Sequence, residues 1–163
     1  MKSRLISLFA VAALVILAWS PASQVQAANI TVKGGSCHAL QFLPTTVPEP
    51  LHFSDGSIAN PTGDSRYTVV CDVPRQPLAA TATAGGFYVD GTNFPGQQTT
   101  CTLASFNFTG VFLGSQTFTE SFTTYDHFVS LPASQLGTWA YIALTCSLPA
   151  SGFGSFIGVT SVQ

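Results

Sequence analysis

The sequence predicts an all-β fold: an antiparallel β-sandwich or jelly-roll-like single domain stapled by two disulfides. Three observations lead to this prediction. Short extended segments rich in Val, Thr and Phe alternate with Gly, Pro, Asn and Asp turn residues. The mature part of the chain shows no convincing helical period. Four cysteines follow an export signal, and an even number in an oxidising compartment is typical of disulfides.

Residues 1–27 are predicted to be a cleaved signal peptide. A basic start precedes an apolar run, Leu5 to Trp19, and small and polar residues then lead to Ala27. The apolar run is shorter than the roughly 20 residues of a spanning helix, which argues against an uncleaved membrane anchor. We therefore expect a secreted or periplasmic domain, residues 28–163, with no membrane anchor after cleavage.

Nine segments of this domain have strand-like composition and are separated by turn residues such as Asp55-Gly56 and Pro95-Gly96. In chain order they are 30–33, 51–53, 67–73, 87–89, 99–108, 116–123, 127–131, 139–148 and 156–162. Alternation in 117–123 predicts that Phe118 and Phe122 face the core. Residues 138–144 are apolar on both sides, which predicts a central strand that is covered on each face.

The chain carries a weak internal duplication. Residues 36–42 and 100–106 share the pattern [ST]-C-x-[AL]-x-x-F. Residues 67–74 are echoed by 141–149, each an apolar strand with a cysteine that stops at Pro. Chance similarity among Thr, Leu and Phe in a β-rich chain is the alternative explanation, because such short patterns have low specificity.

A true duplication selects one disulfide connectivity, Cys37–Cys71 with Cys101–Cys146. Each of these bridges would contribute about 4 kcal/mol in the chain-entropy treatment. The rival pairing of Cys37 with Cys146 and Cys71 with Cys101 stays open. Metal binding by the four thiolates is not expected, since no C-x-x-C spacing occurs.

Sparse charge limits the partners of the domain. Only Lys33, Arg66 and Arg75 are basic once the signal peptide is removed. Three scattered cations cannot form the basic stripe that phosphate backbones require, so we exclude nucleic acid as a partner. An anionic membrane surface is an equally poor partner.

No motif nominates a catalytic residue, a metal site or a cofactor, and we predict none of the three. The nucleophile-elbow pattern G-x-S-x-G is absent, and no pair of carboxylates stands out as glycosidase-like. His38, His52 and His127 lie in no metal-ligand spacing. A Ser-His-Asp site built from Asp126 and His127 stays open only because such triads are spatial.

Two features could bind a ligand. Residues 55–64 gather oxygen atoms in a loop, as calcium sites do, although Asp, Asn, Gly and Pro are also ordinary turn residues. Four aromatic residues at or near turns could form a stacking platform for a sugar ring or another protein: Tyr88, Phe94, Tyr125 and Phe153. Packing of loop ends onto the core is the alternative role for these rings.

The chain as a whole looks like exported bacterial β-proteins with two cysteine pairs. Its first half also resembles secreted pilus or spore-coat-like subunits in Cys37, Phe42, Gly56-Ser57-Ile58 and the strand Tyr67–Cys71. This resemblance implies a fibre subunit that takes a strand from its neighbour. The second cysteine pair, which ends in Cys146–Pro149, departs from the pattern.

From these observations we expect a secreted, non-catalytic surface or binding module. Its ligand or protein partner is not specified by the sequence. A subunit of a self-assembling surface fibre is the alternative function, and an extracellular hydrolase is the third.

Overall fold

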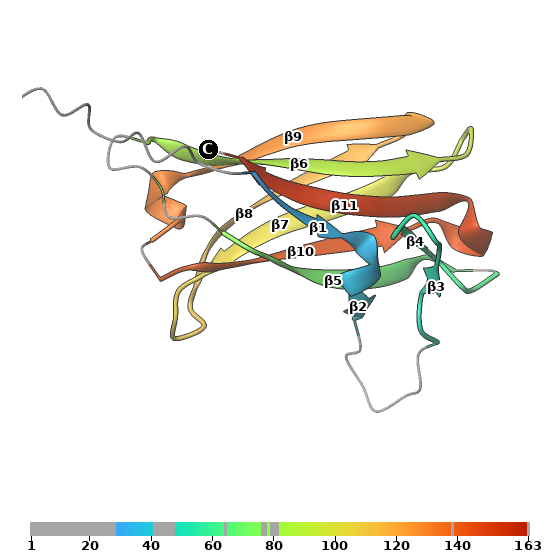
Figure 1. Ribbon diagram of the computed structural model, residues 1–163, viewed down its shortest axis with the longest axis horizontal. Coiled ribbons are helices and arrows are strands. Elements are labelled where there is room, and N and C mark those ends of the chain that lie inside the picture. The colour runs from blue at the N-terminus through green and yellow to red at the C-terminus, as the bar shows by residue number, and fades with distance from the viewer. Residues whose placement is uncertain are drawn as a thin grey trace, which may run out of the picture.

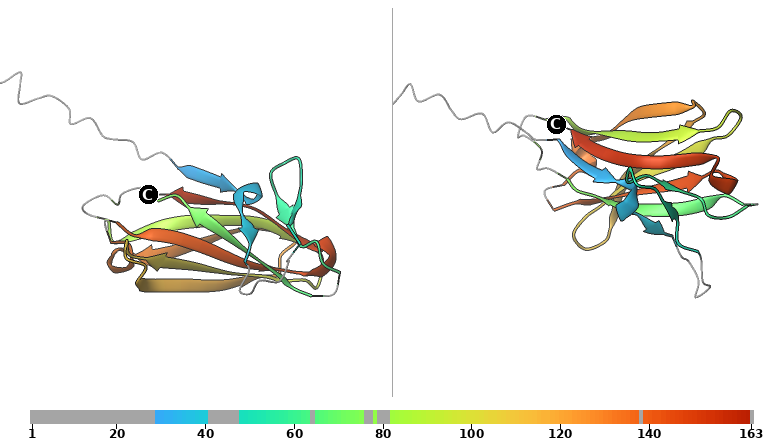
Figure 2. Two further views of the ribbon diagram at one scale, coloured as in Figure 1. Left: turned by 90° about the horizontal axis from the view of Figure 1, so that it is seen from below. Right: turned by 45° about the vertical axis from the view of Figure 1, so that its right-hand side comes forward.

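Two antiparallel sheets pack face to face in the computed structural model of the protein, which confirms the predicted β-sandwich with two disulfides (Figures 1 and 2). The predicted signal peptide lies outside the residues that the structure describes. Those residues are 29–40, 48–63, 65–75, 78, 82–137 and 139–162.

The first sheet, sheet A, has β11 and β6 at its centre. Its strands follow the order β3 (Leu51–His52), β4 (Ile58–Ala59), β11 (Gly154–Val162), β6 (Ala84–Asn93) and β9 (Thr124–Pro132). A further strand, β1 (Ile30–Lys33), pairs with β11 beyond the part that contacts β4.

The second sheet, sheet B, lies behind sheet A in Figure 1. Its order is β2 (His38–Ala39), β5 (Tyr67–Val73), β10 (Tyr141–Leu148), β7 (Thr99–Phe106) and β8 (Phe112–Glu120). The described helical structure is limited to three short 3-10 turns: η1 (Gly34–Ser36), η2 (Ala133–Gln135) and η3 (Ala150–Gly152). Within the described ranges, no helix is long and apolar enough to cross a membrane.

All nine predicted strands are present, and 30–33 and 67–73 have the predicted bounds. The sequence did not indicate β2 and β4, since two residues are too few to show a period of two. Phe118 packs against the core as predicted. The prediction for Phe122 is wrong: β8 ends at Glu120, so Phe122 lies in the following turn and is 70% exposed.

Strand β10 is central in sheet B, between β5 and β7, as its apolar sequence predicts. Its predicted cover on both faces is wrong, however, because Tyr141 on the outer face is exposed. The apolar outer residues of this strand therefore belong to the surface of the sandwich.

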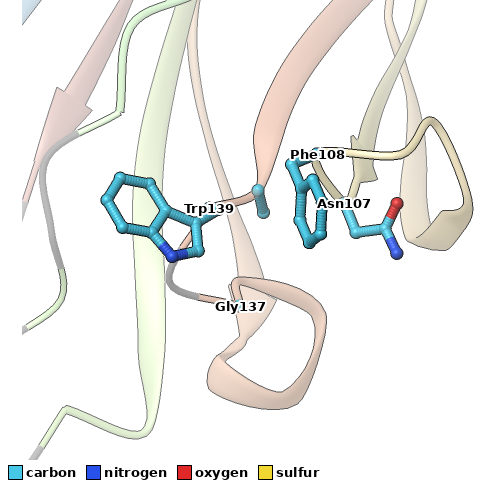
Figure 3. A pocket seen from close by; sticks show the side chains of 5 residues that line it. Asn107, Phe108, Gly137 and Trp139 are labelled. Atoms are coloured by element: carbon cyan, nitrogen blue, oxygen red, sulfur yellow. The ribbon is translucent and has the colours of Figure 1, made fainter.

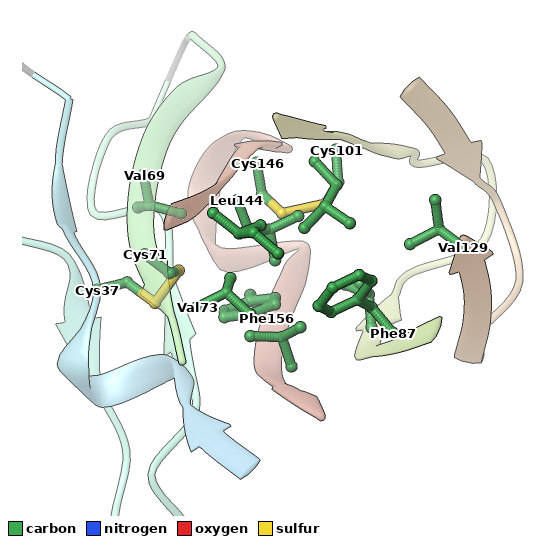
Figure 4. Packing of buried hydrophobic residues seen from close by; sticks show 14 of the residues in the cluster. Cys37, Val69, Cys71, Val73, Phe87, Cys101, Val129, Leu144, Cys146 and Phe156 are labelled. Carbon is green, nitrogen blue, oxygen red and sulfur yellow. A yellow bond between two sulfur atoms is a disulfide. The ribbon is translucent and has the colours of Figure 1, made fainter. Parts of the chain in front are cut away.

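The core lies between the sheets and is built from alternate residues of each long strand (Figure 4). In β10, for example, Ile142 and Leu144 face inward and are buried. Phe87 from β6 and Phe156 from β11 fill the sheet A side of the core. Full burial of such a ring stabilises the fold by about 2–3 kcal/mol. This energy determines which residues of each strand face the core.

Both disulfides bond to strands of sheet B and face the core (Figure 4). Cys101 lies directly opposite Cys146 in the register of β7 and β10. Cys37 comes just before β2 and bonds to Cys71 in β5. This pairing is the one that the internal duplication selects.

The strands have a pseudo-two-fold arrangement, and this arrangement agrees with the duplication in the sequence. In sheet B, β2 flanks β5 as β7 flanks β10, and in sheet A, β4 and β9 flank the central pair β11–β6. The register agrees, because Cys71 lies opposite Leu144 while Cys146 lies opposite Val69. The pseudo-axis therefore passes through the pair formed by Val70 and Thr145.

The edge of β11 that faces away from β6 is paired along its length by two segments of the same chain. Phe156 and its neighbour pair with β4, and residues 158–161 pair with β1. A donor strand from another subunit would need a vacant position of this kind. At this edge, the described residues already supply the strand.

Candidate functional site

The structure separates Asp126 from His127. The two are consecutive in β9, so their side chains point to opposite faces of the sheet. His127 stacks on Phe118, with ring centroids 3.9 Å apart, and its Nδ1 is hydrogen-bonded to Glu120 Oε1. The Asp126 carboxyl instead lines a hollow on the outer face of sheet A. This pair therefore cannot form a Ser-His-Asp site.

The other histidines and the oxygen-rich loop form no metal centre in the part of the chain that is described. His38 and His52 are exposed on separate short strands. Asp55 accepts hydrogen bonds from the Ser57 amide at 2.9 Å and the Ser57 hydroxyl at 2.7 Å, which lower the pKa of its carboxyl. One oxygen of this carboxyl, Oδ1, thus closes a turn, and Asp64 lies outside the described residues. Within those residues, no three His, Cys, Asp or Glu side chains gather as metal ligands would.

The four aromatic residues that the sequence nominates do not form one platform. Phe94 and Phe153 meet edge to face, with centroids 5.6 Å apart. Tyr88 packs against a ring from the neighbouring strand, on the outer face of sheet A. Tyr125 is buried, because it alternates inward along β9, and burial raises the pKa of its hydroxyl to about 12.

A different set of rings gathers at one end of sheet B, and we call it the aromatic platform. It consists of Phe106, Phe108, Phe112, Trp139 and Tyr141. Three of these rings form a row across neighbouring strands, because Phe106 lies opposite both Tyr141 and Phe112. Phe106 stacks on Tyr141 with centroids 5.5 Å apart and meets Phe112 edge to face at 5.8 Å.

The remaining two rings of the platform border open space. Trp139 is 75% exposed and Phe108 is 74% exposed. They line two adjoining hollows of about 480 and 250 Å³, and among the described residues Asn107, Gly137 and Ala140 also line the smaller one. Figure 3 shows the two aromatic side chains on either side of this space.

A tight turn holds Phe108 outward. The Asn107 side-chain oxygen accepts hydrogen bonds from the Thr109 amide at 3.0 Å and from the Val111 amide at 2.8 Å. Gly110 has a φ of 82°, a backbone conformation that favours glycine. With its neighbours fixed in this way, Phe108 projects from the tip of the turn.

Arg75 holds the segment that carries Trp139. Its guanidinium donates hydrogen bonds to the carbonyl of Gly137 and, at 3.5 Å, to the carbonyl of Ala140. These two carbonyls lie on either side of Trp139 in the chain. Arg75 is therefore a positioning residue for the indole.

Sequence reasoning missed Phe108 and Trp139. The Asn-Phe-Thr-Gly segment, 107–110, does carry a signal, since a large ring between turn residues has no strand face on which to be buried. Trp139 carries no local signal of this kind. It reaches the platform because β10 and β7 pair in one register.

Beyond the platform, the outer face of sheet B bears rows of hydroxyl groups. Thr100 and Thr119 are hydrogen-bonded through their hydroxyls at 3.0 Å, and Thr102 and Thr117 at 2.8 Å. Thr145 in β10 lies opposite Thr102 and extends one of these rows. The face thus offers aromatic surface at one end and uncharged hydrogen-bonding groups along its length.

Comparison of the sequence with protein-family models and with curated proteins gives no match. Among solved structures, the chain is similar to the glycosylation-associated protein (Gap123) complex from Streptococcus agalactiae, with a TM-score of 0.54 and 6% identity over 82% of this chain and 25% of that chain. It is also similar to the CBM36-1 domain of a multidomain xylanase from the hindgut metagenome of Trinervitermes trinervoides, with a TM-score of 0.48 and 10% identity over 83% of this chain and 98% of that chain. A third is the xylan-binding module CBM15, with a TM-score of 0.45 and 10% identity over 82% of this chain and 96% of that chain. The similarity to the Gap123 complex has the highest of these three TM-scores. At 6% identity it shows a shared fold and nothing more.

Proposed function

We propose that the protein is a non-catalytic carbohydrate-binding module that holds a neutral sugar chain on the aromatic platform. The observation that carries this proposal is the exposure of Trp139 and Phe108 across a shared hollow. Monomeric proteins rarely expose contiguous apolar patches of large rings without a binding role. Sugar rings present apolar C–H faces that stack on such aromatic side chains.

The charge of the platform supports a neutral ligand. The described residues that line the two hollows at Trp139 carry no titratable side chain. Asp72 lies at the margin, where it lines a separate hollow together with Tyr141. The threonine rows beyond the platform can donate and accept hydrogen bonds from sugar hydroxyls.

The described lining of the two hollows at Trp139 also supports binding without catalysis. Hydrolysis of a glycosidic bond requires two carboxyl groups that flank the scissile bond, and the described lining of the hollows at Trp139 supplies none. An open, shallow surface also suits a chain that lies across it rather than a substrate that is enclosed.

Retention on insoluble polysaccharides tests this proposal. The exported protein is mixed with cellulose, xylan, mannan and other neutral glucans, and the bound fraction is measured against protein concentration. For the polysaccharide that retains it, Trp139→Ala and Phe108→Ala should each weaken binding about 10- to 100-fold, since central aromatic anchors dominate such contacts.

Phe122→Ala is the matched control, because Phe122 is about as exposed as Trp139 and Phe108 but lies in the turn after β8. It should leave retention unchanged. If both platform variants are retained as strongly as the wild type, the sugar binds elsewhere on the protein. Failure to bind any neutral polysaccharide would overturn the proposed function.

A further inference from the structure

A further hollow, of about 330 Å³, lies on the outer face of sheet A, opposite to the face that bears the platform. Its described lining comes from β6, β9, β11 and the residue before β1, and consists of Asn29, Tyr88, Asp90, Asp126, Thr160 and Val162. The carbohydrate-binding proposal for the platform uses none of these residues. An aromatic side chain and two carboxyl groups line the same hollow here, whereas the described lining of the two hollows at Trp139 carries no carboxyl group.

The aromatic wall of this hollow is Tyr88 with Phe128 beside it. The two rings are 5.1 Å apart between centroids and are tilted by 53°. Phe128 lies over Gly86, where an added Cβ would come within 2.7 Å of the ring. Both rings remain exposed, so a ligand can reach their faces.

Next to this wall, Asp90 and Asp126 lie directly opposite each other in the register of β6 and β9. Like charges in such positions destabilise a sheet. Burial and the neighbouring Asp126 raise the pKa of Asp90 to about 6, against a smaller opposing effect of Lys33. At neutral pH the pair therefore concentrates negative charge that Lys33 does not fully balance.

We propose that this hollow binds an amino sugar in its protonated, unacetylated form. An ammonium group between the two carboxyls relieves their repulsion, which a neutral sugar cannot do. The ring face of Tyr88, which Phe128 supports from the neighbouring strand, attracts the same cation and stacks on the sugar ring. Asn29 and the Thr160 hydroxyl, which is hydrogen-bonded to Thr31 at 2.9 Å, are available to the sugar hydroxyls.

The test compares the trimer of glucosamine with the trimer of N-acetylglucosamine at pH 6.5, by calorimetry and by amide chemical shifts. The glucosamine trimer should bind at least 10-fold more tightly and should shift the amides of residues 88–90 and 126–128. Asp126→Asn and Tyr88→Ala should each weaken this binding about 10-fold or more, with thermal unfolding recorded to show that both variants are folded.

Two control variants separate this site from the platform and from general charge attraction. Trp139→Ala should leave glucosamine binding unchanged, so failure of the carbohydrate-binding proposal for the platform would not be mistaken for failure here. Asp72→Asn removes an exposed carboxylate from the outer face of sheet B and should also have no effect. An equal loss in Asp72→Asn and Asp126→Asn would overturn the proposal, as would equal affinity for the two trimers.

Acidification provides an independent test. The groups that face Asp90 are Asp126 from β9, Lys33 from β1, Tyr88 from its own strand and the buried Tyr125, while Thr160 from β11 is uncharged. Between pH 6.5 and 4.5 Asp90 gains a proton, and affinity should fall by up to about 30-fold. The amines of the ligand become more fully protonated over the same range, so the ligand cannot cause this fall. Affinity that is unchanged or rises on acidification would contradict the proposal.

Discussion

The aromatic side chains on the two outer faces of the sandwich have neighbours of different charge. On sheet B, Phe108 and Trp139 border hollows whose described lining carries no charge. On sheet A, Tyr88 lies beside two carboxyls that face each other across β6 and β9. Rings without charge favour a neutral ligand, and rings beside carboxylates favour a cation. Alternation along the strands allows this difference, since outward residues are free of the packing that fixes the core.

The faces also differ in how their strands are held. Both disulfides lie in sheet B, where they join β2 to β5 and β7 to β10. The strands of sheet A that carry Asp90 and Asp126 are held by backbone hydrogen bonds and core packing. Covalent cross-links therefore secure the sheet that carries the platform.

Removal of the bridge between β7 and β10, the two strands that carry Phe106 and Tyr141 of the platform, should have the largest effect on this comparison. The double variant Cys101→Ala/Cys146→Ala opens a loop with a sequence separation of 45, which should lower the free energy of unfolding by about 4 kcal/mol. Denaturant unfolding without reductant measures this loss. A loss below about 1 kcal/mol would show that strand pairing alone holds sheet B.

Arg75→Ala should have the next largest effect, and only on the neutral ligand. Loss of the hydrogen bonds to the Gly137 and Ala140 carbonyls frees the segment that carries Trp139. Polysaccharide binding should weaken about 3- to 10-fold, the usual scale of one or two lost hydrogen bonds. Arg66→Ala is the control, because Arg66 contacts Ser147 and Gln98 elsewhere on sheet B. Equal losses in the two variants would remove the positioning role of Arg75.

The smallest predicted effect concerns the repulsion between Asp90 and Asp126 on sheet A. A carboxyl with a raised pKa in the folded state holds its proton more tightly there than in the unfolded chain. The stability that it provides is thus present below about pH 4 and is lost as the pH rises through about 6. Because Asp90 borders an open hollow, solvent screens its charge. We therefore expect ionised Asp90 to lower the free energy of unfolding by about 1 kcal/mol at neutral pH.

Asp90→Asn should therefore raise the free energy of unfolding by about 1 kcal/mol at pH 7.5 and leave it unchanged at pH 3.5. Denaturant unfolding at the two pH values measures the difference. The same substitution at Asp72, which lies opposite Ala143 on sheet B rather than opposite a carboxylate, should not give this stabilisation at pH 7.5. A stabilisation of Asp90→Asn that is equal at both pH values would mean that the repulsion is not its cause.

The sequence was sufficient to predict the sandwich and the long strands, and it favoured the observed disulfide pairing while a rival pairing stayed open. These depend on local composition and on the repeated cysteine pattern, as in 67–73 and 141–148. The hollow at Phe108 was not predictable, because Trp139 reaches it only through the pairing of β7 with β10. The facing of Asp90 and Asp126 likewise depends on the register of β6 and β9, which are separated in sequence by two strands of sheet B. Local patterns indicate what each strand buries, whereas register decides which outward residues meet.

Trp139 offers the most direct test of the central claim, because it is the only tryptophan once residues 1–27 are removed. Its fluorescence in the exported protein can be followed during titration with soluble oligosaccharides of a polysaccharide that retains the protein. We predict a saturable change in emission, with the same midpoint as binding measured by calorimetry, because the sugar stacks on the exposed indole. Calorimetric binding without any change in Trp139 emission would contradict a platform-bound sugar.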